Sequence, residues 1–199
     1  MRKFTALREA DTADELWLLG HQPVYTLGQA ADSMHILNSG DIPVIKIDRG
    51  GQVTYHGPGQ IMFYLLADLR RHGLGVRQLV ELLENTVIEL LAGYGVQASG
   101  NREAPGVYVN GNKIAALGLR ISRGCSYHGL CLNYQFDATP FAGINPCGYS
   151  GMQVTQLSDC VATLPAKQRL VQQFIGLLQS KLGYSIEQGS QARVLNWPP

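Results

Sequence analysis

Cys147 is the residue of this sequence best placed to act as a nucleophile. It stands between Pro146 and Gly148 in the segment Gly143–Gly151 (GINPCGYSG), which predicts a rigid, irregular loop. A loop thiol near a positive charge ionises readily, and the Gly148 amide could donate a hydrogen bond to an oxyanion. The alternative is an inert thiol, the commoner state of a lone cysteine, but inert thiols are typical of buried helices and strands. The loop position therefore favours a reactive Cys147.

Lys113 is the residue best suited to move a proton. It opens the run at residues 112–119 (NKIAALGL), which is otherwise apolar as far as Arg120. A desolvated lysine has a lowered pKa and can exchange protons near neutrality. The alternative is that Lys113 extends from a hairpin end into water. On the same strand face, Ala116 and Gly118 leave room for a thin acyl chain or for close backbone packing.

The segment Arg49–Gln60 (RGGQVTYHGPGQ) has the composition of a ligand-binding wall. Its four glycines allow a ligand to approach the backbone, and Arg49 and His56 could bind a phosphate or a carbonyl group. The alternative is an ordinary turn between two strands. Neither common glycine-rich nucleotide motif matches, so the segment is weak evidence for a nucleotide site.

The spacing Cys125-x-x-His128-x-x-Cys131 could be mistaken for a metal site. If this segment is a strand, alternation places Cys125 and Cys131 on one face and His128 on the other, so we expect no metal. Cys160 stands outside any cluster and is expected to be incidental. His21 has no partner in the sequence, which predicts a surface or boundary residue.

Two helices and a strand-rich middle must position these residues. An apolar stripe from Val76 to Leu91 predicts an amphipathic helix closed by Gly93, and a second helix is expected from about Pro165 to Leu182, ended by Gly183. Short apolar runs predict strands: ELWLL, PVYTL, PVIKID, IMFYLLA, GVYV, KIAALGLRIS and SYHGLCLNYQ. ELWLL could equally end a first helix.

The connections between these runs indicate the fold class. Asn110-Gly111-Asn112 joins GVYV to KIAALGL and predicts a tight hairpin, because Asn-Gly accepts positive φ at little cost. The pattern as a whole predicts an α+β fold, a mixed β-sheet with flanking helices. No linker or repeat divides residues 1–199, so we expect a single domain.

Composition narrows the class of protein further. The 199 residues are 45% hydrophobic and 16% charged, which is typical of a globular chain. A formal net charge of +1 gives no long-range attraction to nucleic acid or to an anionic membrane. No apolar run is long enough for a membrane span or a signal peptide, and four cysteines suit a reducing compartment. We therefore expect a cytoplasmic protein that binds neither nucleic acid nor membrane.

Three segments closely resemble the lipoyl(octanoyl) transferase family, in that family's order and spacing. They are RGGQVTYHGPGQ, APGVYVNGNKIAALGLRISRGCSYHGLCLNY and INPCGYSGMQVTQL, within a resemblance that runs from about Phe4 to Leu157. The resemblance implies a catalytic domain of the biotin/lipoate protein ligase type, in agreement with the α+β prediction. Met1 aligns inside the family's first helix, so we expect the segment that usually precedes it to be absent. If that segment forms a strand, its loss would expose a sheet edge.

The same resemblance implies the site residues. The acyl-carrying cysteine falls on Cys147, and the lysine that favours its thiolate form and relays protons falls on Lys113. The family's acyl-substrate contacts fall on Arg49, Gly50, Gly51, Gln52, Val53, Thr54, Tyr55 and His56, on Ala116, Leu117 and Gly118, and on Gly129, Leu130 and Cys131. Ala116 and Cys131 depart from the serine and alanine that are common in the family.

The reaction implied is a double displacement. The Cys147 thiolate takes an octanoyl group from octanoyl-acyl carrier protein, and a lysine then accepts it, on lipoyl domains of 2-oxoacid dehydrogenases or on the glycine cleavage H protein. We expect no ATP, cofactor or metal. The rivals are an ATP-dependent lipoate or biotin ligase on the same fold, which needs no thiol, and a catalytically silent protein that binds the same partners. A cysteine protease is a poorer candidate, because no Asn or Asp partner for His56 or His128 is apparent.

Overall fold

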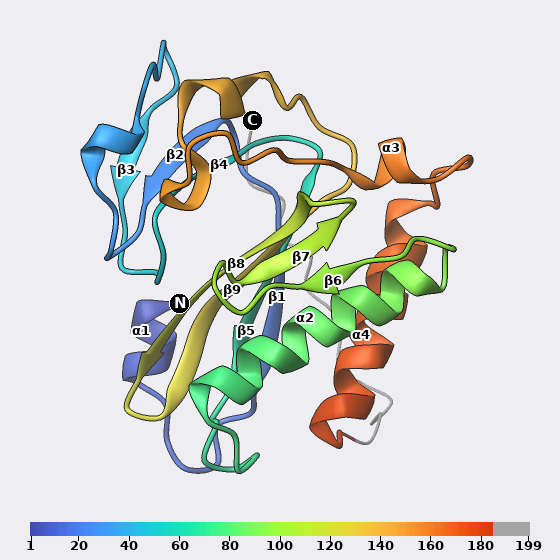
Figure 1. The fold of residues 1–199 in the computed structure, drawn as a ribbon. Helices are drawn as coiled ribbons and strands as arrows, with labels where there is room; N and C mark the ends of the chain where they lie inside the picture. The colour runs from blue at the N-terminus through green and yellow to red at the C-terminus, as the bar shows by residue number, and fades with distance from the viewer. Residues whose placement is uncertain (185–199) are drawn as a thin grey trace.

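The computed structural model describes residues 1–184, which form two β-sheets with the longer helices on one face of the larger sheet (Figure 1). The larger sheet is antiparallel throughout and has the strand order β1-β5-β9-β8-β7-β6. Its strands are β1 Glu15–Leu19, β5 Gln60–Leu66, β9 Cys125–Asn133, β8 Asn112–Ser122, β7 Gly106–Val109 and β6 Ser99–Gly100.

The smaller sheet is mixed and has the order β3-β2-β4, with β2 parallel to β3 and antiparallel to β4. Its strands are β2 Val24–Leu27, β3 Val44–Lys46 and β4 Val53–His56. The α+β prediction is confirmed, but within residues 1–184 the strands divide between two sheets, and the parallel strand pair belongs to the smaller one. A second core of five buried residues lies behind it: Tyr25, Val53, Tyr55, Phe136 and Ile144.

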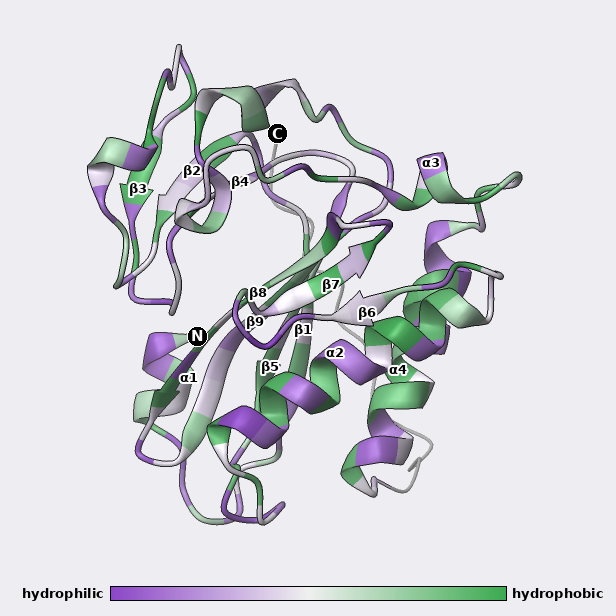
Figure 2. Ribbon diagram, in the orientation of Figure 1, coloured by the Kyte–Doolittle hydropathy of each residue, from purple (hydrophilic) through white to green (hydrophobic). Residues whose placement is uncertain are grey.

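Helices α2 (Val76–Ala92) and α4 (Lys167–Leu182) lie side by side against the larger sheet (Figure 1). Figure 2 shows hydrophobic and hydrophilic residues alternating along both helices, while β5 beneath them is hydrophobic. The Phe63 and Phe174 rings pack with their centroids 3.9 Å apart, which fixes α4 on the sheet. Burial of each such side chain stabilises the fold by about 1.5–3 kcal/mol.

The predicted helix ends are confirmed except at the start of α4. Gly93 caps α2, and Gly183 ends α4 in the left-handed conformation with φ 72°. Pro165 does not open α4, because Ala166 is extended and the Pro165 carbonyl accepts a hydrogen bond from the Tyr134 hydroxyl at 2.6 Å. The first helical residue is therefore Lys167.

Two tight hairpins connect the strands that contain Lys113 and Cys131. Asn110 and Gly111 have φ of 50° and 81° between β7 and β8, which confirms the predicted turn. Arg123 and Gly124 repeat this geometry between β8 and β9 with φ of 51° and 78°. ELWLL is strand β1 and does not end a helix.

His128 departs from strand alternation. Its φ is 60°, and its ring bonds the same Asp48 carboxylate as the Tyr127 hydroxyl. The prediction that His128 faces away from Cys131 was therefore wrong, since both line the same cavity. Within residues 1–184, no group of three or more His, Cys, Asp or Glu side chains could hold a metal ion.

Short helical turns complete the described chain. They are α1 Arg2–Ala6, η1 Ser33–His35, η2 Thr139–Gly143, η3 Pro146–Gly148 and α3 Leu157–Cys160. None of the helices described in residues 1–184 is both long enough and apolar enough to cross a membrane.

Candidate active site

The Lys113 side chain points at the sulfur of Cys147. Its Nζ lies 3.0 Å from Cys147 Sγ and 3.2 Å from the Pro105 carbonyl oxygen, and only 3% of the residue is exposed. The alternative in which Lys113 extends into water is therefore wrong. The Tyr108 ring covers the ammonium, with its centroid 5.1 Å from Nζ.

The chain after Cys147 is fastened beside Lys113 by backbone hydrogen bonds. The Lys113 amide donates to the Gln153 carbonyl at 2.9 Å, and the Thr155 amide donates to the Lys113 carbonyl at 3.0 Å. These bonds make a parallel bridge between Lys113 and Val154. The register explains why a residue of β8 meets a thiol in a distant loop.

Cys147 itself has a left-handed backbone, with φ 56° and ψ 17°, inside η3. This conformation costs a non-glycine residue about 1–2 kcal/mol, so neighbouring bonds must hold it. The Gly148 amide donates to the Asn145 carbonyl at 3.0 Å, and the Tyr149 amide donates to the Pro146 carbonyl at 3.1 Å. The Gly148 amide therefore closes this turn, and the prediction that it serves an oxyanion was wrong.

The charge on Lys113 is set by opposing effects. Burial lowers the pKa of Lys113, but the facing Cys147 thiolate and the Tyr108 hydroxyl raise it more, so the net direction is upward. The predicted lowering of this pKa was wrong in sign while Cys147 is a thiolate. Lys113 is thus held in its ammonium form by the facing Cys147 thiolate.

Two buried amides support the pair from below. Asn133 Nδ2 donates to the Thr155 carbonyl at 2.9 Å and to the Lys113 carbonyl at 3.4 Å. Gln60 Nε2 donates to Asn133 Oδ1 at 2.8 Å, and the Gly57 amide donates to Gln60 Oε1 at 3.0 Å. Sequence reasoning included Gln60 in the candidate ligand-binding segment Arg49–Gln60 without giving it a role, and it missed Asn133, although a polar residue at the end of an apolar strand was the available signal.

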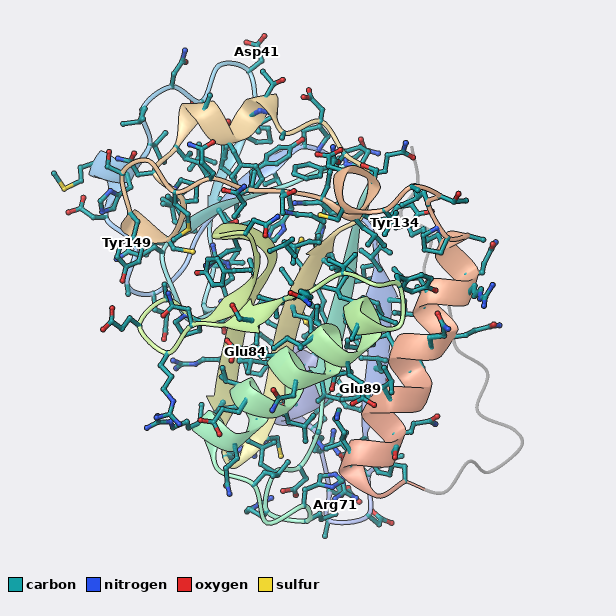
Figure 3. The ribbon with its side chains drawn as sticks, turned by 45° about the vertical axis from the view of Figure 1, so that its right-hand side comes forward. Asp41, Arg71, Glu84, Glu89, Tyr134 and Tyr149 are labelled. Atoms are coloured by element: carbon teal, nitrogen blue, oxygen red, sulfur yellow. The ribbon has the colours of Figure 1, made fainter. Side chains whose placement is uncertain are left out.

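Glu84 supports the strand beneath Lys113 from helix α2, whereas Tyr149 comes from the loop that carries Cys147 (Figure 3). Glu84 Oε1 accepts a hydrogen bond from the Gly106 amide at 2.7 Å. A Cβ at Gly106 would lie 2.9 Å from Lys113 Cε, so glycine is required there. Burial raises the pKa of Glu84, and Lys113 opposes this rise.

A cavity of about 580 Å³ lies between the two sheets and leads away from this pair. A second cavity of about 10 Å³ is lined by both Lys113 and Cys147. The two share Thr54, Ala116 and Cys131 in their walls. The larger volume is within the range of about 300–1,000 Å³ for small-ligand sites.

The floor of the larger cavity consists of two rows of residues across the larger sheet. One row is Ala116, Cys131, Met62 and Leu19, and the next is Gly118, Gly129, Tyr64 and Trp17. Neighbouring strands are about 4.8 Å apart, so each row crosses about 14 Å from β8 to β1. The rows lead from the Cys147 end of the cavity to the sheet edge.

The residues expected to contact the acyl substrate divide into two groups. Those in the wall of the larger cavity are Arg49, Thr54, His56, Ala116, Leu117, Gly118, Gly129, Leu130 and Cys131. Those outside its wall are Gly50, Gly51, Gln52, Val53 and Tyr55. Val53 and Tyr55 face the second core, because alternation along β4 turns them away from Thr54 and His56.

Arg49 stiffens the cavity wall by bonding to its own protein. Its guanidinium donates to the Thr26 carbonyl and the Gln52 carbonyl at 2.7 Å, and to the Gly50 carbonyl at 2.9 Å. Burial lowers the pKa of Arg49 to about 10, which leaves it charged at neutral pH. A Cβ at Gly118 would lie 2.9 Å from Arg49 Cδ, so the room predicted at Gly118 is occupied by this arginine.

Three histidines lie around the apolar cavity. His56 is 8% exposed, and burial, followed by the charges of Arg49 and the other histidines, lowers its pKa to about 3. His21 Nε2 lies 2.8 Å from the Tyr64 hydroxyl, with its ring centroid 5.6 Å from that of His56. His21 is therefore a half-buried residue in the cavity wall with a hydrogen-bond partner, which confirms the boundary position expected for it.

Asp48, which lies between the cavity residues Ile47 and Arg49, holds three chain segments together. This carboxylate accepts hydrogen bonds from Arg2 Nε at 2.9 Å, the Tyr127 hydroxyl at 2.5 Å and His128 Nε2 at 3.0 Å. Burial alone would raise the pKa of Asp48, but these donors hold it well below its usual range. One ionised carboxylate thus ties the smaller sheet to β9 and α1.

Comparison with known proteins identifies relatives over most of the chain. The model of the lipoyl protein ligase A/B catalytic domain matches residues 2–179. An octanoyltransferase of Ectopseudomonas mendocina is 54% identical over 185 residues, which cover 93% of this chain and 90% of the relative. One of Alkalilimnicola ehrlichii is 60% identical over 165 residues, covering 83% and 77%.

Solved structures with the same fold are more distant in sequence. A lipoate-protein ligase A bound with ATP has a TM-score of 0.72 at 12% identity, covering 99% of this chain and 81% of that protein. A bipartite lipoate protein ligase of Thermoplasma acidophilum has a TM-score of 0.71 at 12% identity, covering 99% and 80%. At this identity the likeness establishes the fold alone.

Proposed function

This chain belongs to the lipoyl protein ligase A/B catalytic domain family, and on that basis we propose that it transfers an octanoyl group from octanoyl-acyl carrier protein to a lysine of lipoyl domains. The transfer proceeds through a thioester on Cys147, in a single catalytic domain. The observation that carries the proposal is the 3.0 Å approach of Lys113 Nζ to Cys147 Sγ at one end of an apolar cavity.

The first half-reaction moves the acyl group to the protein. The Cys147 thiolate adds to the carbonyl carbon of the donor thioester, and the bond from that carbon to the carrier sulfur then breaks. The leaving thiolate takes a proton from the Lys113 ammonium. The products are a neutral acyl-enzyme and a neutral lysine, and burial favours the neutral form of Lys113.

The second half-reaction restores the starting state. The amine of the acceptor lysine adds to the thioester carbonyl, its proton passes to Lys113, and Cys147 leaves as a thiolate. The ammonium and thiolate then face each other again, which is the arrangement in which the pKa of Lys113 is raised. Aminolysis of a thioester runs downhill, so the donor supplies the activation and no ATP is needed.

The cavity suits an eight-carbon chain that crosses the strands. An extended chain advances about 1.2 Å per covalent bond, so seven carbon–carbon bonds reach about 8 Å. Two strand spacings, from Cys131 over Met62 to Leu19, amount to about 10 Å. An octanoyl chain with its carbonyl carbon beside Cys131 would therefore cover most of this path toward β1.

Intact-protein mass spectrometry tests this function. The wild-type protein mixed with octanoyl-acyl carrier protein and no ATP is expected to gain one octanoyl group that hydroxylamine removes. Cys147→Ala should abolish the adduct, whereas Cys160→Ala, a change at the other partly exposed cysteine, should retain it. An absolute requirement for ATP, with Cys147→Ser still active, would instead identify an adenylate-forming ligase.

A further inference from the structure

We infer that the side-chain amide of Gln60 and the hydroxyl of Thr54 form the oxyanion hole of this acyl transfer. Each donates a hydrogen bond to the acyl oxygen when sulfur or nitrogen adds to the carbonyl carbon. The inference rests on the proposed function, because it assigns donors to the tetrahedral intermediates of that reaction. Gln60 ends the segment Arg49–Gln60, but it is not among the residues to which the family resemblance assigns substrate contact.

The chemistry requires such donors. Addition of the Cys147 sulfur converts the carbonyl π bond into a negatively charged oxygen, and collapse re-forms the carbonyl while the carrier sulfur leaves. Fixed donors aimed at that oxygen lower the barrier without transferring a proton. The amide of Gly148, the residue that follows Cys147, already donates to the Asn145 carbonyl. Side chains must therefore be considered.

The 10 Å³ cavity has the position and size of a site for one oxygen atom. Lys113, Cys147, Thr54, Gln60 and Asn133 all line it, and it meets the larger cavity at Thr54. About 10–15 Å³ of such volume holds a single water-sized atom. An acyl group with its carbonyl carbon on the sulfur and its chain in the larger cavity can direct its oxygen into this space.

One N–H of the Gln60 side chain has no hydrogen-bond partner within residues 1–184. Its Oε1 accepts from the Gly57 amide at 3.0 Å, and one N–H donates to Asn133 Oδ1 at 2.8 Å. These two bonds fix the orientation of the amide and leave its second N–H without a partner. Asn133 cannot take this role, because its own two N–H groups bond to Thr155 and Lys113 carbonyls.

Thr54 supplies the second donor from the opposite sheet. Its hydroxyl has no hydrogen-bond partner among residues 1–184, and the residue lines both cavities. Alternation along β4 directs Thr54 to this side while Val53 and Tyr55 face the second core. Gln60 is only 1% exposed, so its donor is already desolvated and held in place.

The test separates oxyanion stabilisation from positioning of the thiolate. Gln60→Met and Thr54→Val remove the donors with little change in size. We would measure the single-turnover rate of acylation by octanoyl-acyl carrier protein and, separately, the rate at which iodoacetamide alkylates Cys147. Alkylation attacks a saturated carbon and forms no oxyanion, so it reports only on the thiolate.

We expect Gln60→Met to slow acylation by about 10²–10³-fold and Thr54→Val by at least about 10-fold, with alkylation within about twofold of wild type. Thr54→Ser should restore acylation, and Gln29→Met, an exposed control, should change neither rate. Unchanged acylation, or a parallel fall in alkylation, would overturn the inference. If Gln60→Met does not fold, the acylation and alkylation rates of the Thr54 variants test the inference. Failure of the wild type to acylate would refute the proposed function itself.

Discussion

Lys113 Nζ and Cys147 Sγ lie 3.0 Å apart although 34 positions separate them in the chain. The backbone bridge between Lys113 and Val154 holds this distance, and Asn133 bonds to both sides of the bridge. The pair is therefore positioned by sheet register as well as by the loop that carries Cys147.

Replacement of Lys113 should separate its two tasks. Lys113→Met removes the charge that stabilises the thiolate, so alkylation of Cys147 at pH 7 should slow, and acyl transfer should fall by about 10²–10⁴-fold. Lys113→Arg keeps a cation but cannot release a proton. Its Cys147 should therefore be alkylated faster than that of the Met variant, while acyl transfer stays low. Equal rates of acyl transfer by wild type and Lys113→Met would show that Lys113 does not relay protons.

Gly118 should be indispensable because Arg49 packs against it. Gly118→Ala places a Cβ 2.9 Å from Arg49 Cδ and 3.3 Å from the Gly50 carbonyl oxygen. We expect a loss of about 1–3 kcal/mol in the free energy of unfolding, measured by urea denaturation. Gly176→Ala is the matched control, since nothing lies within 4 Å of its Cβ in α4, and it should stabilise by about 0.5–1 kcal/mol. Equal stability of Gly118→Ala and wild type would show that Arg49 is free to move.

Local signals in the sequence predicted the elements but not how they meet. The Asn110-Gly111 turn and the apolar stripe of α2 are encoded by neighbouring residues, and both predictions are confirmed. The separation into two sheets depends on pairings such as β1 with β5, which connect distant segments and leave no local period. For the same reason, the residues alone did not bring Lys113 to Cys147, and the family resemblance was needed.

The predictions that failed concern buried polar residues. His128 was placed by strict alternation, but its φ of 60° turns the ring toward Asp48. The boundary position expected for His21 is confirmed, but its partner Tyr64, which lies 43 positions away, was not predicted. Gln60 and Asn133 received no individual role from the sequence. Tertiary hydrogen bonds decide the position of each of these side chains.

Stability should fall on mild acidification because His56 is buried in its neutral form. Its folded pKa of about 3 lies below the unfolded value of 6.5, so its contribution is complete above pH 6.5 and is lost as the pH falls toward 3. Between pH 7 and pH 5 this one group should cost about 2 kcal/mol. His21 and His128 have lowered pKa values and act in the same direction.

Urea denaturation of wild type and His56→Gln at pH 7 and pH 5 measures this contribution. The variant does not titrate at position 56, so its stability should fall by about 2 kcal/mol less than that of wild type over this interval. The interval lies above the usual pKa of aspartate, which keeps Asp48 and Asp14 out of the comparison. Identical pH dependence in the two proteins would mean that His56 is protonated in the folded state.

The acyl length preference should depend on Leu19, the last residue of the floor row that starts at Ala116. Leu19→Phe shortens the path from Cys131 and should favour six-carbon over eight-carbon donors, whereas Leu19→Ala should admit ten carbons. One methylene in an apolar pocket changes relative rates by about 10–200-fold. Acylation rates with six-, eight- and ten-carbon carrier thioesters give the ratio directly. Leu16→Ala, on the helix-facing side of β1, is the control, because it should lower stability without changing the ratio. An unchanged ratio in both Leu19 variants would show that the chain does not run across the strands toward β1.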